Sequence, residues 1–339
     1  MKLFSNRERT DPIKLGIIGC GIAAKKLHYP ALKKLKEKFT ITAVCNHTEP
    51  KAKEFSKMVG GVPYTLDYKE LLAMEDVEAV DIVLPIHLNR LVIADALKAG
   101  THVIAEKPIA GNLSDALELV ELAENSQQVA MIAENIRYRK LFQRVRELIN
   151  SDAIGEVNSF SWDFYYKIDA RNEYARTEWR KDHKYEGGII TDAGVHNIAA
   201  IRLLFGDIAS GSALTWNVNP EIGRTDSIRM NFKTTNGIHG SFNMSASVEG
   251  YSENRLLIFG KRGTIIIEHD DIEVMNPEGK SFKESMSDDG GFKAQFENFY
   301  GAVRNGDEVV STFREAQKDI EVLLKAYQSA ESGGPFNLV

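Results

Sequence analysis

Cysteine is scarce in this chain, with two residues among 339, Cys20 and Cys45. Neither has the spacing of metal ligands, and one bridge would be a thin framework for a chain of this size, so we expect free, reduced thiols. Basic blocks and basic arms are also missing, since 42 lysine and arginine residues stand against 48 acidic ones, for a net charge of −6. This balance argues against nucleic acid and anionic membranes as partners.

Long apolar runs and low-complexity segments are missing as well. No uninterrupted apolar stretch approaches the ~18 residues that span a bilayer. The N-terminal segment MKLFSNRERTDP is polar and has no apolar signal core, so we expect a cytoplasmic protein. The apolar (43%) and charged (27%) fractions are ordinary for a soluble globular protein. The length suggests two domains, at roughly 150 residues each.

The first 135 residues alternate short apolar segments with amphipathic ones. Strands are expected at 14–19, 39–46, 79–85 and 102–108, and helices at 22–38, 50–58, 66–74, 88–99 and 114–125. The strands are nearly continuous apolar runs without polar alternation, which indicates a parallel sheet covered on both faces. Residues 1–135 are therefore predicted to form a doubly wound α/β domain.

The pattern changes after residue 135. Most of 155–275 is typical of strands separated by turns, with a strong hairpin signal at Asn236-Gly237 and another turn from Lys261 to Gly263. Helices are expected at 140–150, 194–205 and 313–330. Residues 136–339 are therefore predicted to form a second domain with a mainly antiparallel sheet.

The first predicted strand ends in a glycine-rich loop with the pattern G-x-G-x-x-A. Its first glycine permits a tight turn, its second lets the backbone approach a pyrophosphate, and its alanine allows close helix–sheet packing. The N–H groups at the start of the following helix then bind the phosphates. The candidate phosphate loop is Gly19, Gly21, Ile22, Ala23 and Ala24. Dinucleotide binding is the favoured interpretation, and a turn that needs glycine only for packing is the alternative.

The residues after the second predicted strand discriminate between NAD and NADP. A carboxylate at this place would hold the adenosine ribose and repel a 2′-phosphate. The chain has Asn46, His47 and Thr48 there, with Lys51 one helical turn onward. These side chains can donate hydrogen bonds to a phosphate and Lys51 adds positive charge, so NADP is preferred over NAD. The alternative makes His47 and Lys51 ordinary surface residues.

Two further patterns place charged residues in apolar surroundings. Glu106 and Lys107 directly follow an apolar strand, at the carboxyl end where ligands of open α/β sheets bind, and Pro108 comes next. Asp192 and His196 lie four residues apart in GGIITDAGVHNIAAI, so they share one face if the segment is a helix. A surface salt bridge is the alternative for the first pattern. For Asp192 and His196, a hydrogen bond within the core explains the pattern as well as an acid/base pair does.

The glycine loop, Glu106-Lys107-Pro108 and the D-x-x-x-H of Asp192 and His196 resemble the Gfo/Idh/MocA oxidoreductases, which include many sugar dehydrogenases. The likeness extends over nearly the whole chain in the same order. It implies an amino-terminal Rossmann domain and a carboxy-terminal α/β domain. The open sheet of the second domain would serve substrate binding and assembly into a homodimer or homotetramer.

The resemblance also assigns roles to residues of this chain. It implies a catalytic set of Lys107, Asp192 and His196. Beyond the phosphate loop, the implied cofactor contacts are Asn46, His47, Lys51, Leu84, Pro85, His87, Asn89, Glu106, Lys107, Asn135, Trp179 and Arg180. The implied substrate contacts are Lys107, Arg137, Tyr166, Asp192 and His196. No metal is expected, because D-x-x-x-H has no further ligand cluster beside it at metal-ligand spacing.

These residues suit hydride transfer between a nicotinamide and the hydroxyl-bearing carbon of a sugar, polyol or related compound. His196 would exchange the hydroxyl proton, since an imidazole titrates near neutral pH. Lys107 would hydrogen-bond the reacting oxygen, and Asp192 would orient His196 or bind a neighbouring hydroxyl. Two alternatives share the same fold: a redox-neutral NAD-dependent glycoside hydrolase and a non-catalytic nucleotide or sugar sensor.

Overall fold

The computed structural model describes residues 11–169, 171–181, 185 and 187–338. The chain folds into two compact units. The first unit holds the residues up to 110, with 114–135 and 291–314, and the second holds 111–113, 136–290 and the residues from 315 onward.

Residues 291–314 thus lie in the first unit, although they belong to the range 136–339 expected for the second domain. Helix α9 (Phe292–Asn305) accounts for this placement. Its fully buried Phe296 packs edge-on against the rings of His28 and Phe39, at 5.4 and 5.8 Å between ring centres. The apolar face of α9 therefore completes the core of the first unit.

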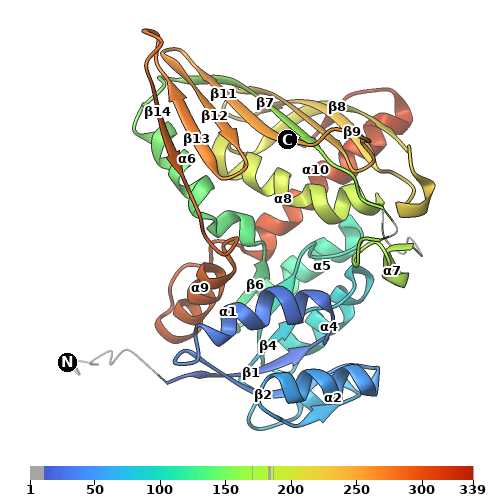
Figure 1. Ribbon diagram of the computed structural model, residues 1–339. Coiled ribbons are helices and arrows are strands. Elements are labelled where there is room, and N and C mark those ends of the chain that lie inside the picture. The colour runs from blue at the N-terminus through green and yellow to red at the C-terminus, as the bar shows by residue number, and fades with distance from the viewer. Residues whose placement is uncertain (1–10, 170, 182–184, 186, 339) are drawn as a thin grey trace, which may run out of the picture. The chain divides into compact units, whose positions relative to one another are not determined.

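The first unit is built on a six-stranded parallel sheet with the strand order β3-β2-β1-β4-β5-β6 (Figure 1). This order is that of doubly wound nucleotide-binding folds, and it confirms the predicted fold class. Central strands of such a sheet are covered on both faces, and β4 accordingly buries all four of its residues. The strands span Ile13–Ile18 (β1), Phe39–Cys45 (β2), Tyr64–Thr65 (β3), Ala79–Ile82 (β4), His102–Glu106 (β5) and Ala130–Ala133 (β6).

The helix after the glycine loop differs from the predicted 22–38. It ends at Lys33, and its first part is a π-helical segment, η1 (Ala24–His28), followed by α1 (Tyr29–Lys33). Single π-helical turns inside helices are frequent at functional sites. The remaining helices of this unit are α2 (Glu49–Met58), α3 (Tyr68–Leu72), α4 (Ile86–Lys98) and α5 (Leu113–Glu124).

The second unit is built on a nine-stranded sheet with the order β14-β13-β12-β11-β7-β10-β9-β8-β15. Its neighbouring strands are antiparallel, except that β7 and β10 are parallel, so the sheet is mainly antiparallel as predicted. The strands span Val157–Tyr165 (β7), Ile208–Trp216 (β8), Ser227–Thr234 (β9), His239–Ser245 (β10), Glu253–Gly260 (β11), Gly263–Glu268 (β12), Asp271–Met275 (β13), Ser281–Ser285 (β14) and Phe336–Asn337 (β15).

Local sequence explains the hairpins of this sheet. Asn236 and Gly237 connect β9 to β10, with Gly237 at φ +82°, and Lys261 and Arg262 connect β11 to β12, which confirms both predicted turns. Every second residue of β9 from Ile228 onward is buried, and the residues between them are exposed. This alternation means that one face of the sheet packs on the core and the other faces outward.

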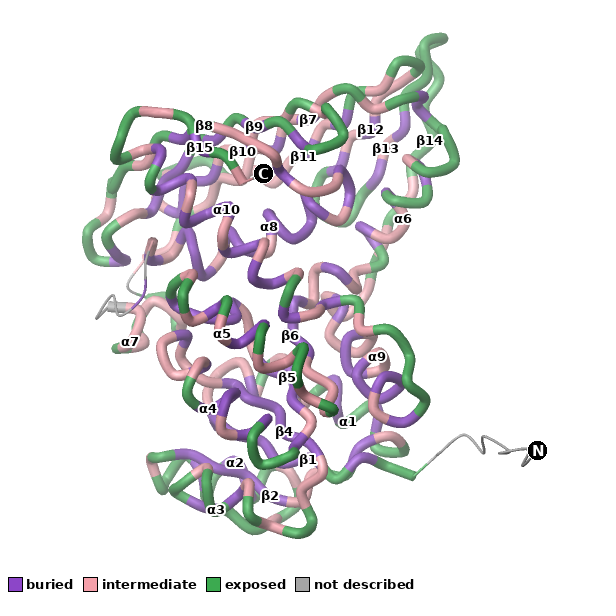
Figure 2. Tube along the Cα trace, turned by 180° about the vertical axis from the view of Figure 1, so that it is seen from behind, coloured by how far each residue is buried: buried purple, intermediate pink, exposed green. Residues whose placement is uncertain are grey.

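Helices α6 (Lys140–Asn150), α8 (Gly188–Phe205) and α10 (Phe313–Ser332) cover the buried face of this sheet (Figure 1). Figure 2 shows that α8 is buried along most of its course. Phe205 at its end stacks on Phe160 of β7, with ring centres 4.1 Å apart. Short helical segments are η2 (Asn135–Tyr138), α7 (Glu178–Lys181) and η3 (Pro220–Ile222).

One helix among the described residues, α8, has the length and composition to cross a membrane. In the fold, however, 78% of that stretch is buried inside the protein, as in the core helix of a soluble domain. Its apolar residues are therefore accounted for by packing within the second unit.

Candidate active site

The two glycines of the phosphate loop serve different physical purposes. Gly19 has φ +104°, and a Cβ there would lie 2.1 Å from the carbonyl oxygen of Val83, so only glycine fits. A Cβ at Gly21 would meet no described atom within 4 Å, so the loop has open space beside that position. Ala24 is fully buried, as close helix–sheet packing requires. The loop thus has the room and the backbone geometry that a pyrophosphate needs.

Asn46 follows β2 and connects the phosphate loop to the next loop. Its side-chain oxygen accepts a hydrogen bond from the Cys20 N–H at 3.1 Å, and its amide donates to the Thr48 carbonyl at 3.2 Å. His47 and Lys51, in contrast, are exposed at this end of the strand. Asn46 therefore supports the loop structurally, while His47 and Lys51 remain the candidates for contact with a 2′-phosphate.

The backbone around Lys107 is held on both sides. The buried Asn89 of α4 donates hydrogen bonds to the carbonyls of Glu106 (3.0 Å) and Pro108 (2.9 Å). A Glu106 side-chain oxygen accepts the Lys107 N–H at 3.1 Å, and the Lys107–Pro108 peptide bond is cis. Asn89 and Glu106, both expected as cofactor contacts, are thus supports of the lysine segment, and Lys107 itself is partly buried at the end of β5.

A buried histidine that the sequence interpretation missed connects this segment to β4. His28 Nδ1 lies 2.9 and 3.0 Å from the two carboxylate oxygens of Asp81, and its Nε2 lies 2.7 Å from a Glu106 oxygen. His28 and Asp81 are fully buried. The available signal was Asp81 itself, because a carboxylate inside an apolar strand requires a partner.

The remaining candidates of the first unit also lie at the carboxyl ends of strands. Leu84 and Pro85 connect β4 to α4, with Pro85 as the helix N-cap, and His87 lies in the first turn of α4. Asn135 follows β6. Because the carboxyl ends of parallel strands share one edge of the sheet, these residues lie along the edge at which β5 presents Lys107.

In the second unit, Asp192 and His196 both lie on α8, as their spacing predicts. The Asp192 carboxylate is buried and accepts a hydrogen bond from Arg180 Nε at 2.7 Å. The Arg180 guanidinium lies over the ring of Trp179, 4.0 Å from its centre, and 5.3 Å from that of Tyr174. Trp179 and Arg180, expected at the cofactor, thus build the surroundings of Asp192.

Tyr166 also lies in the surroundings of Asp192. Burial, and next the negative charge of Asp192, raise the pKa of Tyr166 above its ordinary value. The Tyr166 ring stacks on Phe164, with ring centres 4.7 Å apart. Tyr166 remains a candidate substrate contact, because it is close enough to Asp192 to feel the charge of that carboxylate.

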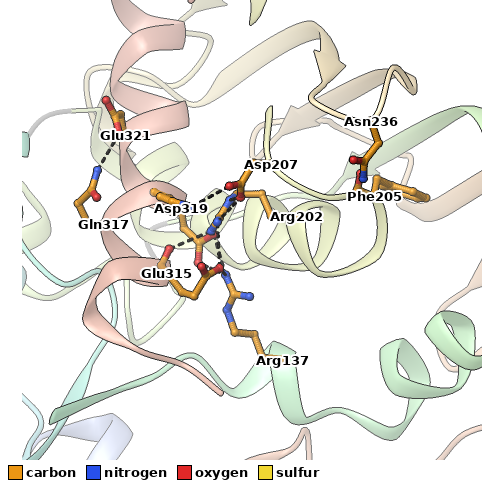
Figure 3. Close-up of polar contacts among 10 residues, drawn as sticks. Arg137, Arg202, Phe205, Asp207, Asn236, Glu315, Gln317, Asp319 and Glu321 are labelled. Carbon is orange, nitrogen blue, oxygen red and sulfur yellow. Dashed lines mark hydrogen bonds and ion pairs between the residues drawn. The ribbon is translucent and has the colours of Figure 1, made fainter. Parts of the chain in front are cut away.

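Arg137, expected at the substrate, lies in a buried ion cluster of the second unit (Figure 3). Its guanidinium donates to both oxygens of Asp319 at 2.9 and 2.7 Å. Arg202 pairs with the same Asp319, and also with Glu315 and Asp207. The charge of Arg137 is therefore balanced within this cluster, which joins α8 and α10, and we assign it a structural role.

Two family models match the chain. Residues 13–134 match the oxidoreductase family with an NAD-binding Rossmann fold, and residues 142–266 match the Gfo/Idh/MocA C-terminal domain. Among the residues that the structure describes, no group of three or more His, Cys, Asp or Glu side chains is arranged to hold a metal ion.

Individual relatives agree with the family models. An oxidoreductase of known structure from Thermotoga maritima is 38% identical with a TM-score of 0.91, over 96% of this chain and 98% of that one. The dehydrogenase FPY6 of Fusarium mangiferae is 30% identical, over 96% of this chain and 99% of its own. D-apiose dehydrogenase of Rhizobium rhizogenes is 28% identical, over 80% of this chain and 79% of its own. The chain therefore belongs to the Gfo/Idh/MocA family of oxidoreductases, with an NAD-binding Rossmann fold in its first unit.

Proposed function

We propose that this protein is an NADP-preferring dehydrogenase or reductase that acts on a CH–OH group of a sugar, polyol or related compound. The observation that carries the proposal is the Lys107 segment, whose N–H and flanking carbonyls are all held by hydrogen bonds at the carboxyl end of β5. Ligands of open α/β sheets bind at this edge. The similarity to D-apiose dehydrogenase supports a sugar-like substrate.

The side chains divide the chemical work in this proposal. The phosphate loop from Gly19 to Ala24 holds the pyrophosphate of NADP, whose nicotinamide supplies the hydride acceptor or donor. Lys107 donates a hydrogen bond to the reacting oxygen and stabilises its developing negative charge. His196 takes the hydroxyl proton during oxidation and returns it during reduction. Asp192, held by Arg180, binds a neighbouring hydroxyl or orients His196.

The reaction is tested by following NADPH absorbance at 340 nm over a panel of sugars, polyols and their keto forms. We expect turnover in the wild type, loss of turnover in Lys107→Ala and His196→Ala, and unchanged NADPH binding in both variants. Undiminished turnover in both variants would refute the assignment. Cleavage of a glycoside with no net change in NADPH would instead identify the redox-neutral hydrolase, and binding without any turnover would identify the sensor.

The preference for NADP rests on the exposed Lys51 and His47 and on the absence of a carboxylate at the Asn46 position. We expect Lys51→Ala to lower kcat/KM for NADPH by about tenfold, the loss of about 1.4 kcal/mol, with little effect on NADH. Lys57→Ala is the matched control, because it removes an exposed lysine from the last turn of the same helix. Equal losses for both coenzymes in Lys51→Ala would contradict the role at the 2′-phosphate.

We further propose assembly into a homodimer or homotetramer through the outer face of the nine-stranded sheet. Leu214, Trp216, Phe259 and Met275 are exposed large apolar residues on its strands. The strand register places their side chains on the face opposite to the helices. Leu214 and Trp216 form one apolar group and Phe259 and Met275 a second one, with exposed polar residues of β9 between them. Exposed apolar groups of this kind support a protein interface. The cytoplasmic location and the absence of nucleic-acid and membrane partners stay predictions.

A further inference from the structure

His28 makes close contacts with two carboxylates on neighbouring strands of the first unit. Its Nδ1 lies within 3.0 Å of both oxygens of Asp81 on β4, and its Nε2 lies 2.7 Å from Glu106 at the end of β5. The imidazole is fully buried. α9 closes the cluster with the rings of Phe292 and Phe296, at 6.2 and 5.4 Å between ring centres.

When both carboxylates are ionised, this geometry requires a proton on each ring nitrogen of the imidazole. A neutral histidine carries a proton on one ring nitrogen and a lone pair on the other, so one of the two carboxylates would face a lone pair. A doubly protonated imidazolium donates to both carboxylates. Burial lowers the pKa of His28, but the charges and hydrogen bonds of Asp81 and then Glu106 raise it to about 10. α9 faces the imidazole with the aromatic rings of Phe292 and Phe296.

The cluster continues from the histidine to the proposed catalytic lysine. One oxygen of Glu106 contacts His28 and the other accepts the backbone N–H of Lys107. The Glu106 carboxylate therefore cannot rotate away from His28 without also releasing the lysine N–H. Asn89 holds the carbonyls of Glu106 and Pro108, but neither bond restrains the Glu106 side chain.

We propose that His28 is a positioning residue, a permanently charged imidazolium that bridges Asp81 and Glu106 and thereby holds the backbone of Lys107 in its reactive place. This inference rests on the proposed function, because it gives His28 a role only if Lys107 acts on the substrate. If the bridge had a purely structural role, replacing His28 would lower stability, and kcat would fall only as far as in any other variant of equal stability. A bridge that positions Lys107 affects kcat beyond its effect on stability, because small displacements of a reacting group are costly.

The test compares three variants of the full-length protein. His28→Asn keeps a donor near Asp81 but is too short to reach Glu106, whereas His28→Gln extends an amide towards the Nε2 position. Phe296→Leu is the matched control, because it loosens the packing around the imidazole and leaves both ion pairs in place. We expect kcat to fall at least about tenfold in His28→Asn. We expect partial recovery in His28→Gln and a smaller loss in a Phe296→Leu protein of equal thermal stability. NADPH affinity should change by less than about twofold in all three.

A second readout does not depend on turnover. In protein labelled with ¹⁵N-histidine, the resonances lost in His28→Gln belong to His28, and we expect both ring nitrogens to be protonated at pH 8.5. A neutral imidazole at that pH, or a kcat in His28→Asn no lower than in Phe296→Leu, overturns the inference. Full turnover in Lys107→Ala instead refutes the role of Lys107 in the proposed function, and with it the premise of the positioning role.

Discussion

At the residue scale, identical residue types in this fold serve unlike purposes. Gly19 is required by its own chain, because its φ of +104° and the Val83 carbonyl leave no place for a Cβ. Gly21 is not required by any protein contact, since a Cβ there meets nothing described within 4 Å. The proposed contact with the pyrophosphate would account for glycine at the second position, because a ligand approaches the backbone most closely where no side chain intervenes.

Alanine substitutions separate these two purposes. Gly19→Ala should lower the free energy of unfolding by at least about 2 kcal/mol, through backbone strain and the clash with Val83. Gly21→Ala should leave the melting temperature unchanged and weaken NADPH binding at least about tenfold, because the new methyl group occupies the space of the pyrophosphate. Circular dichroism melts and NADPH fluorescence titrations measure the two effects. Equal NADPH affinity of Gly21→Ala and wild type would contradict a phosphate at this loop.

The raised pKa of His28, about 10, has a consequence for stability. Between pH 6.5 and 9 the folded protein keeps a proton on His28 that the unfolded chain releases, so the free energy of unfolding falls as pH rises. One such proton changes the free energy of unfolding by at most about 1.4 kcal/mol per pH unit. Urea unfolding at pH 7, 8 and 9 should show this decline in the wild type and a flatter profile in His28→Gln. Parallel pH profiles in the wild type and His28→Gln would contradict the raised pKa of His28.

At the element scale, a buried ion cluster joins the two core helices of the second unit. Asp319 of α10 contacts Arg137 and Arg202, and the three side chains are almost fully buried. A buried ion cluster is weak support for high stability, because desolvation offsets much of the attraction. Removing one member of the cluster is strongly destabilising, because the remaining charges stay buried and lose that partner.

Asp319→Ala should therefore lower the free energy of unfolding of the second unit by about 3–5 kcal/mol. The three tryptophans, Trp162, Trp179 and Trp216, all belong to this unit, so tryptophan fluorescence in urea reports its unfolding. The matched control is Glu156→Gln, which breaks an exposed pair with Lys261 and should leave the midpoint nearly unchanged. Similar shifts in the two variants would show that burial of the cluster has no energetic weight.

At the scale of the whole molecule, the nine-stranded sheet has one face covered by helices and one face open. Leu214 is 68% exposed and Trp216 is 41% exposed on the open face. Exposed apolar side chains on a broad sheet gain free energy when a second copy covers them. The closed point groups of homo-oligomers make a dimer or a tetramer the expected product.

Replacing Leu214 and Trp216 together by Glu should shift the protein to a smaller species in light scattering after size exclusion. The introduced charges would be buried without partners in the interface. Val310→Glu is the control, because Val310 is exposed and belongs to the first unit, whereas the sheet belongs to the second. A wild-type protein that is monomeric at micromolar concentration would contradict the proposed interface.

The sequence alone determined the features that depend on neighbours along the chain. Apolar runs separated by helical patterns predicted the parallel sheet, the G-x-G-x-x-A pattern predicted the turn at Gly19, and Asn236-Gly237 predicted a hairpin. It also placed Lys107 at a strand end and put Asp192 and His196 on one helix. These features follow from local geometry, because strand alternation, helical periodicity and the φ angles open to glycine are properties of a few consecutive residues.

Only the tertiary structure decided which charges face each other. Arg137 was expected at the substrate and Arg180 at the cofactor, yet Arg137 pairs with Asp319, 182 residues away, and Arg180 pairs with Asp192. His28 gave no signal of its own in the sequence, because its partners Asp81 and Glu106 lie 53 and 78 residues onward. The physical reason is that burial makes a charge depend on its partner, and the partner is chosen by how strands and helices assemble, which no local pattern encodes.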